Sequence, residues 1–266
     1  KKRLFIVLLM SFGLCQVSHP FPPLHLVTIP TSGTLPEGSF SFETLLINEG
    51  GLVPRLSVGI TNNLTLGFSW GIQNLIGDIK PTLNKSYPDY HMKYRIWDED
   101  MVKPGIVIGF DSQGRGKFLD TIIDHESEQG NVIEVNRYDE KSLGYYIAFS
   151  KNYDVFGNLG LHVGINKSLE TDDGDEDLNL FFGIDKELNR SFSLMIEYNA
   201  MLNDNEDLYE YDDISLGRGV GYLNAGLRWT IADNLLVELN FNDISQNQVV
   251  SETAHREFKV LYSKIF

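Results

Sequence analysis

Hydrophobic and polar side chains alternate with a period of two residues along most of the chain beyond residue 37. The clearest runs are 64–73, 192–199 and 235–242. Strict alternation indicates β-strands, because successive side chains of a strand point to opposite faces of the sheet. The same test over the whole chain predicts about twelve strands, at 38–46, 53–61, 63–73, 89–97, 104–111, 142–151, 158–168, 177–185, 191–200, 219–231, 234–243 and 255–266.

The connections between these segments differ in length in a regular way. Short connections follow the even-numbered strands, and long ones follow most odd-numbered strands, at 74–88, 112–141, 201–218 and 244–254. Transmembrane β-barrels have this asymmetry, with short periplasmic turns and longer extracellular loops. An even strand count places both barrel ends of the chain on the periplasmic side. The pattern therefore predicts an all-β fold: a single closed antiparallel transmembrane β-barrel over residues 38–266.

One face of each predicted strand is apolar, and the other is small, polar or charged. A soluble β-sandwich adhesin is the alternative, but it would have to bury its apolar faces against each other. In a closed barrel the apolar face can contact lipid while the ring of strands satisfies every backbone group. The barrel interpretation assigns a set of charged residues to the lumen, namely Glu43, Arg55, Lys93, Arg95, Asp185, Glu197, Arg228 and Glu238.

The last predicted strand carries aromatic and apolar residues at alternate positions up to the final residue. These are Phe258, Val260, Tyr262 and Phe266. They resemble the C-terminal signature of bacterial outer-membrane barrels, which implies recognition by the barrel-insertion machinery. Lys264 departs from that signature at one outward position.

The first residues have the pattern of an export signal. Three basic residues, at positions 1–3, precede an apolar run over 4–14. A basic end followed by roughly 7–15 apolar residues is typical of a secretory signal peptide, which we place at 1–15. Residues 16–37 are rich in proline and glycine, and we expect them to form a periplasmic connector. The expected location is the bacterial outer membrane, with its lipid and lipopolysaccharide as surroundings.

Composition narrows the possible functions. The chain has 22 Lys and Arg against 37 Asp and Glu, a net charge of −15, whereas a nucleic-acid-binding protein needs a basic face. Its one cysteine cannot form an internal disulfide or a cysteine-rich zinc site. No stretch reaches the roughly 18 apolar residues of a membrane-spanning helix.

Four segments carry a family resemblance. They are 29–38 (IPTSGTLPEG), 58–67 (VGITNNLTLG), 109–114 (GFDSQG) and 150–153 (SKNY). Together they resemble the YjbH-like outer-membrane proteins associated with exopolysaccharide production. The resemblance implies a barrel, with exopolysaccharide or its export proteins as partners, and none of its motifs is catalytic.

Two other patterns could carry chemistry. Asp172, Asp173, Asp175 and Asp177 could supply the oxygen ligands that Ca²⁺ prefers, or they could form a solvated loop rim. If a divalent ion binds there, it could bridge to lipopolysaccharide phosphates. We expect no other cofactor.

An outer-membrane lipid hydrolase is the alternative function. His125, Ser127 and Asn131 are its candidate residues, but they fall in a predicted loop that does not fix a base against a nucleophile. His91 and His162 fall on the inward face, where hydrogen bonds in a polar lumen account for them. The first hypothesis is therefore a non-enzymatic pore or scaffold in envelope or exopolysaccharide handling.

Strand register gives a specific expectation for the lumen. A connection centred on Asp233 places Arg228 directly opposite Glu238, because opposed residues of an antiparallel hairpin have a constant index sum. We expect this ion pair to extend to Lys93, Arg95 and Glu197 and to narrow the bore. The predicted result is little or no steady conductance, which rises when Arg228 and Glu238 are both replaced by Ser.

Overall fold

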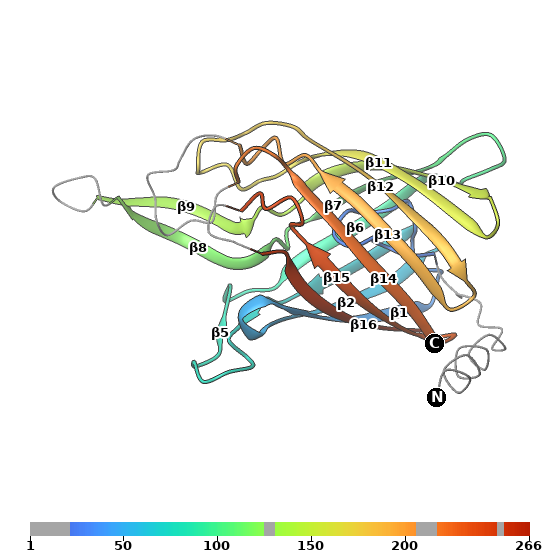
Figure 1. The fold of residues 1–266 in the computed structure, drawn as a ribbon, viewed down its shortest axis with the longest axis horizontal. Helices are drawn as coiled ribbons and strands as arrows, with labels where there is room; N and C mark the ends of the chain where they lie inside the picture. Colours follow the sequence, from blue (N-terminus) through green and yellow to red (C-terminus); the bar gives the residue numbers. More distant parts are fainter. Residues whose placement is uncertain (1–21, 125–130, 206–216, 249–252) are drawn as a thin grey trace, which may run out of the picture.

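The computed structural model describes residues 22–124, 131–205, 217–248 and 253–266. Within them, one antiparallel sheet of fourteen strands closes into a barrel, because β1 pairs with both β16 and β2 (Figure 1). Two short strands, β4 (Ile72–Gln73) and β5 (Thr82–Leu83), lie outside the ring, which leaves twelve. The barrel strands are β1 (Ser39–Ile47), β2 (Gly51–Thr61), β3 (Leu64–Ser69), β6 (Asp89–Trp97), β7 (Gly105–Asp111), β10 (Gly144–Asp154), β11 (Asn158–Lys167), β12 (Asn179–Asn189), β13 (Phe192–Asn199), β14 (Tyr222–Ala232), β15 (Leu235–Asn242) and β16 (His255–Ile265). The predicted twelve-stranded barrel is confirmed.

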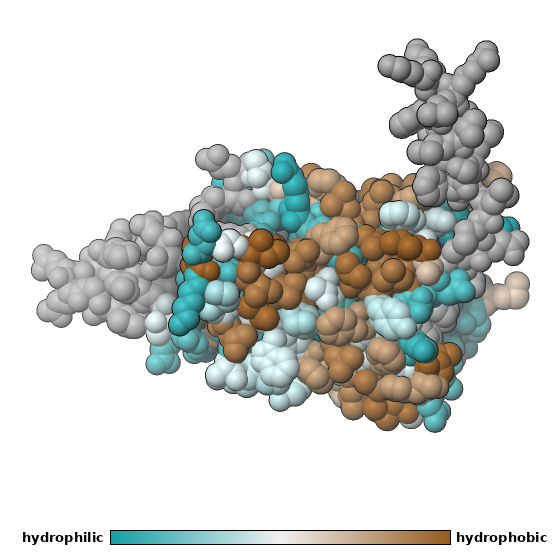
Figure 2. Space-filling model, turned by 90° about the horizontal axis from the view of Figure 1, so that it is seen from below, coloured by the Kyte–Doolittle hydropathy of each residue, from teal (hydrophilic) through white to brown (hydrophobic). Residues whose placement is uncertain are grey.

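The wall of the barrel is apolar outside and mostly polar inside. Along β12, for example, Leu180, Phe182 and Ile184 are 50%, 54% and 44% exposed, while the residues between them are buried. Hydrophobic residues cover most of the middle of the wall on the face shown in Figure 2. A closed barrel with an apolar outer band leaves no unpaired sheet edge in lipid, which is the construction of outer-membrane barrels. The chain is therefore an outer-membrane β-barrel. No helix among the described residues is long and apolar enough to cross a membrane.

The two ends of the barrel differ. At one end, which we call the turn end, short turns join β2 to β3, β10 to β11, β12 to β13 and β14 to β15. The chain also finishes at this end (Figure 1). Longer connections leave the opposite end, which we call the loop end. The exception there is the link between β1 and β2, formed by the 3₁₀ turn η2 (Asn48–Gly50).

Three strands at the loop end were not predicted, namely the short β5 and the two strands of a hairpin. β8 (Arg115–Asp124) and β9 (Asn131–Glu140) pair only with each other and project from the barrel (Figure 1). We had expected a loop over 112–141. Register shifts between Arg115 and Phe118 and between Leu119 and Thr121 interrupt the hairpin, so the period of two that reveals the barrel strands is lost there.

The largest difference concerns the expected periplasmic connector at 16–37. Residues 22–36 lie inside the barrel, and we call this segment the plug. Its tip is a tight turn in which the Leu26 N–H donates to the Ile29 carbonyl at 3.0 Å, next to a bridge between His25 and Pro30. The expected signal peptide at 1–15 lies outside the described residues.

The plug tip forms part of the hydrophobic core of the barrel. Leu26, Val27 and Ile29 are at most 1% exposed. They pack against inward apolar residues of the wall, namely Val107, Tyr146, Ala148, Phe181 and Met195. The plug therefore supplies the apolar contacts that the polar inner wall lacks.

Candidate functional site: the lumen and its plug

The tip of the plug is held by one buried carboxylate. Glu197 on β13 is 1% exposed and accepts the backbone N–H groups of Val27 at 2.9 Å, Thr28 at 2.8 Å and Ile29 at 3.2 Å. It also accepts the Thr28 hydroxyl at 2.6 Å and the Asn224 amide at 2.9 Å. Charge-assisted hydrogen bonds of this kind are the strong class. Glu197 is therefore the main polar anchor of the plug.

Cationic side chains of the lumen hold the plug carbonyls. Lys93 donates to the carbonyls of Leu24, Thr31 and Gly33. Arg228 donates to the carbonyl of His25 at 3.0 Å. A third cation, Arg115 of β8, donates to the Val27 carbonyl at 3.2 Å. Cationic side chains of the wall and of the β8–β9 hairpin thus donate hydrogen bonds to the plug backbone.

The limb of the plug that returns to β1 is held by hydroxyl groups. Ser150 accepts the Ser32 N–H at 2.7 Å, and Thr65 accepts the Leu35 N–H at 2.9 Å. Buried backbone groups need partners, and an extended segment outside a sheet has none of its own. Side chains of the wall supply these partners along the plug, which explains how an irregular segment is stable inside the barrel.

Small residues on the wall make room for the tip. A Cβ added at Gly183 would lie 2.5 Å from the Leu26 side chain, and one added at Gly226 would lie 3.1 Å from that of Val27. A larger residue at Gly183 would meet the plug first, whereas one at Gly226 would meet Asn240 and Met195 of the wall before Val27. The wall is therefore shaped to the segment that fills it.

The predicted lumen residues all lie on the inner face of the barrel, in several separate groups. Arg228 is opposite Glu238 in register, with Nε–Oε1 at 2.6 Å, and Lys259 lies 2.9 Å from the same carboxylate. Our expectation that Lys93, Arg95 and Glu197 extend this network is wrong. Lys93 and Glu197 bind the plug, while Arg95 pairs with Asp98 at 2.7 Å. The reason is that the plug occupies the space through which they would have met.

The remaining predicted lumen residues have other partners. Arg55 pairs with Asp111 at 2.7 Å. Asp185 accepts a hydrogen bond from His162 at 2.7 Å, in a group described below. Glu43 lines the cavity next to the plug tip. The charges of the lumen therefore form separate local groups. A pattern of inward positions alone does not show which charged residues pair with each other.

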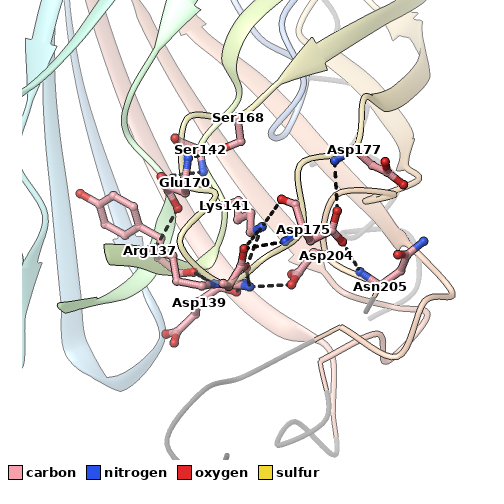
Figure 3. A network of polar contacts seen from close by, with 12 residues as sticks. Arg137, Asp139, Lys141, Ser142, Ser168, Glu170, Asp175, Asp177, Asp204 and Asn205 are labelled. Atoms are coloured by element: carbon pink, nitrogen blue, oxygen red, sulfur yellow. Dashed lines mark hydrogen bonds and ion pairs between the residues drawn. The ribbon is translucent and has the colours of Figure 1, made fainter. Parts of the chain in front are cut away.

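The loop end is closed by a network of buried charges that we call the cap. Arg137 on β9 is fully buried and contacts Asp173 at 2.7 Å and Asp204 at 2.8 Å (Figure 3). Lys141 also binds Asp173, at 2.7 Å. Burial disfavours the charge of Arg137, but Asp204 and Asp173 outweigh that cost and raise its pKa. The cap joins the β8–β9 hairpin to two loops that are distant in sequence.

A single carboxylate adds backbone contacts to the cap. Glu170 accepts the N–H groups of Tyr138 at 2.9 Å and Ser142 at 3.1 Å. Burial raises the pKa of Glu170. The cap is thus held by backbone as well as side-chain partners.

The acidic segment that we considered for Ca²⁺ belongs to this cap. Asp173 is paired with two cations, Asp172 accepts the Asn136 amide at 2.8 Å, and Asp175 accepts the Asn205 N–H at 3.2 Å. Asp177 donates its N–H to Asp175. In the described part of the chain, no group of three or more His, Cys, Asp or Glu residues is arranged to hold a metal ion. The solvated rim is also wrong for Asp173 and Asp175, which are buried.

Two cavities lie on either side of the plug. A cavity of about 60 Å³ separates the plug tip from the cap, and His25, Glu43, Arg55, Arg115 and Glu140 are among its lining residues. The second, of about 560 Å³, lies at the turn end, where Pro22, Pro23 and Thr31–Gly33 of the plug form one side of it. We call the second cavity the vestibule. Since plug residues line both cavities, the plug divides the lumen.

The proposed insertion signal lies on β16 and on Phe266, which follows it, at the seam where the barrel closes. Phe40 of β1 contacts the rings of Tyr262 at 6.1 Å and Phe266 at 5.2 Å between centroids. Phe258 is 40% exposed on the outer wall, and Val260 lies on the same face. This arrangement presents the signal residues to lipid, while recognition by the insertion machinery stays a prediction.

The candidate residues of a lipid hydrolase are not described in full. His125 and Ser127 lie outside the described residues, and the same applies to the side chain of Asn131. Several residues with clear roles in the lumen were not singled out from the sequence. They are Arg115, Arg137, Lys141 and Ser150, which act through partners distant in the chain.

Comparison with known proteins gives fold-level similarity. No family model and no curated protein matches the sequence. Among solved structures, the chain is similar to a KdgM porin (TM-score 0.47, 10% identity, 84% of this chain and 98% of that one). It is also similar to a NanC porin (TM-score 0.39, 9% identity, 85% and 99%). Neither TM-score reaches 0.5, and the assignment to a barrel follows from the strand pairing of this chain.

Proposed function

We propose that this outer-membrane barrel is a gated pore, kept closed by its own N-terminal plug. The observation that carries the proposal is the fit between plug and wall. Above all, the carboxylate of Glu197 accepts hydrogen bonds from three successive N–H groups of the tip. Polar groups of the wall bind backbone atoms of the plug, and such contacts can be exchanged for water when the plug leaves. The apolar tip is small, so its withdrawal is not prohibited by a large core.

The plug has one direction in which to leave. Residues 22–24 and 31–36 both run toward the turn end, and the cap covers the opposite side of the tip. Strand parity places the turn end in the periplasm. Withdrawal into the periplasm would open the lumen from the turn end up to the cap. To open the cap as well, the β8–β9 hairpin would have to separate from the loops that carry Asp173 and Asp204.

A reversible disulfide tests the gate. A Cβ on Gly226 would lie 3.1 Å from Val27 Cγ2, and it would be closer still to Asn240 Oδ1 and, at 2.8 Å, to Met195 Cε. Val27→Cys with Gly226→Cys can therefore form a disulfide once the Asn240 and Met195 side chains move aside. We expect no openings in planar bilayers while the pair is oxidised, and openings after reduction. The single variant Gly226→Cys controls for the added side chain. Equal conductance in both redox states would reject the gate.

The substrate and partners that we propose for the pore rest on the resemblance to YjbH-like proteins. It makes exopolysaccharide, or the proteins that export it, the first partners to test, with the barrel as pore or scaffold. Comparing polysaccharide secretion by cells with the oxidised and reduced plug variant would test this step separately from conductance.

A further inference from the structure

Three polar residues on neighbouring strands form a connected group at the vestibule. Ser150 on β10, His162 on β11 and Asp185 on β12 are 3%, 5% and 7% exposed, and all three line the cavity of about 560 Å³. Ser150 Oγ lies 2.8 Å from His162 Nδ1, and His162 Nε2 lies 2.7 Å from Asp185 Oδ1. Rigid strands hold all three, since Ser150 is directly opposite His162 in register and Asp185 is diagonal to it.

The hydrogen bonds fix the roles of the three residues. Asp185 accepts the Nε2–H of His162, which leaves Nδ1 as an acceptor for the Ser150 hydroxyl. The Ser32 N–H of the plug donates to Ser150 Oγ at 2.7 Å, so the hydroxyl proton is directed at His162. A nucleophile bonded to a base, and a base oriented by a carboxylate, is the arrangement of an activated serine.

We propose that Ser150 and His162, positioned by Asp185, are a hydrolytic site for small acyl esters that enter the vestibule from the periplasm. Ser150 Oγ attacks the ester carbonyl carbon while its proton passes to His162 Nδ1. The bond to the alcohol oxygen then breaks, and the alcohol leaves with that proton. Water then attacks the carbonyl carbon of the acyl-serine and gives one proton to His162 Nδ1. The bond to Ser150 Oγ breaks, Nδ1 returns that proton to Oγ, and the carboxylic acid leaves.

The surroundings favour small polar esters over diacyl lipids. Asn152, Asn158, Asn189, Arg95, Arg190 and Ser193 line the same cavity, and they offer hydrogen bonds to hydroxyl or carboxylate groups of a substrate. The Ser32 N–H of the plug donates to Ser150 Oγ, so the plug backbone helps to orient the nucleophile toward His162. The plug therefore contributes to the site in its closed state, and the proposal does not depend on the plug acting as a gate.

A second serine–histidine pair in the same barrel provides a matched control. Ser57 Oγ lies 2.8 Å from His91 Nε2, but His91 Nδ1 is buried without a partner. Neither residue lines either of the two cavities. This pair has the hydrogen bond but lacks both the carboxylate and the space for a substrate.

The test is covalent labelling of the full chain, folded in detergent, with a small fluorophosphonate. We expect labelling at Ser150, located by peptide mass spectrometry, and hydrolysis of p-nitrophenyl acetate. Ser150→Ala should abolish labelling, and His162→Gln should slow it about 100-fold or more, as loss of a general base does. Ser57→Ala should label like the unmodified protein. Heat-modifiable gel migration verifies that each variant folds.

Asp185→Asn separates a positioning role from a structural one. It keeps the shape of the side chain but favours the wrong imidazole tautomer, so we expect labelling at least about 100-fold slower with unchanged folding. Absence of Ser150 labelling between about pH 6 and 9, labelling at another serine, or equal rates in Asp185→Asn and the unmodified protein would each overturn the proposal.

Discussion

Replacing Glu197 by Ala removes the strongest polar contact between barrel and plug. The carboxylate accepts three consecutive backbone N–H groups, those of Val27, Thr28 and Ile29, and the Thr28 hydroxyl. In the closed state of the variant, these donors are buried next to an empty space. In the open state they are hydrated. The substitution therefore destabilises the closed state selectively.

The magnitude follows from the number of orphaned donors. Each buried donor left without a partner costs about 1–3 kcal/mol, and water entering the vacated space offsets part of the sum. Taking about 3 kcal/mol for the set, the ratio of open to closed plug rises about 100-fold, since 1.4 kcal/mol corresponds to a factor of ten. Glu197→Gln keeps one acceptor oxygen but turns an amide N–H₂ toward the same donors, so we expect a smaller rise of the same sign.

Single-channel recording in planar bilayers measures this ratio as open probability. Glu187→Ala is the matched control, because Glu187 is a carboxylate at the vestibule whose hydrogen bond goes to the Asn158 N–H and not to the plug. We expect Glu197→Ala to open far more often than the control. An open probability that stays at the control level in Glu197→Ala would refute the assignment of Glu197 as the anchor.

Other predictions concern the cap, the lumen and the orientation. Arg137→Ala leaves Asp204 buried without its cation and Asp173 with Lys141 alone, so the cap should lose about 3–5 kcal/mol, measured by protease cleavage of the β8–β9 hairpin relative to Lys117→Ala. Burial raises the pKa of Glu140 to about 8, so the folded state holds a proton that the unfolded state has lost above about pH 4.3. Stability should therefore fall by up to about 1.4 kcal/mol per pH unit as pH rises toward 8, and urea titrations of Glu140→Gln should lack this slope. Arg228→Ser with Glu238→Ser should raise conductance less than loss of the plug does. Epitope tags at 112–141 and 201–218 should be accessible to antibody on intact cells, and tags at 186–190 should not. The reverse result would show that the barrel has the opposite orientation in the membrane.

The barrel could be predicted because its signal is local. Alternation over β12 or β15 reports which face of a strand meets lipid, and the index sum across the turn at Asp233 was enough to place Arg228 opposite Glu238. Each of these inferences uses residues within one strand or one hairpin. Within the sheets, the errors lie at strand ends, at the short strand β5 and at the bulged hairpin β8–β9, where the period of two is broken.

The plug and the cap could not be predicted because their partners are distant in sequence. Glu197 binds residues about 170 positions away, and an inward acid by itself is equally consistent with an open polar lumen. The prolines of the plug break every periodic pattern, so the segment resembles a linker. Likewise, the acidic run at 172–177 repels itself locally, and its burial depends on distant partners such as Arg137 and Lys141.

The central claim, that residues 22–36 close the lumen, is tested most directly by removing them and recording conductance. The full chain should show little or no steady conductance. The variant lacking 22–36, with folding verified by heat-modifiable migration, should show frequent openings that a synthetic peptide of residues 22–36 blocks from the periplasmic side. A large steady conductance in the full chain, unchanged by the deletion, would contradict the account.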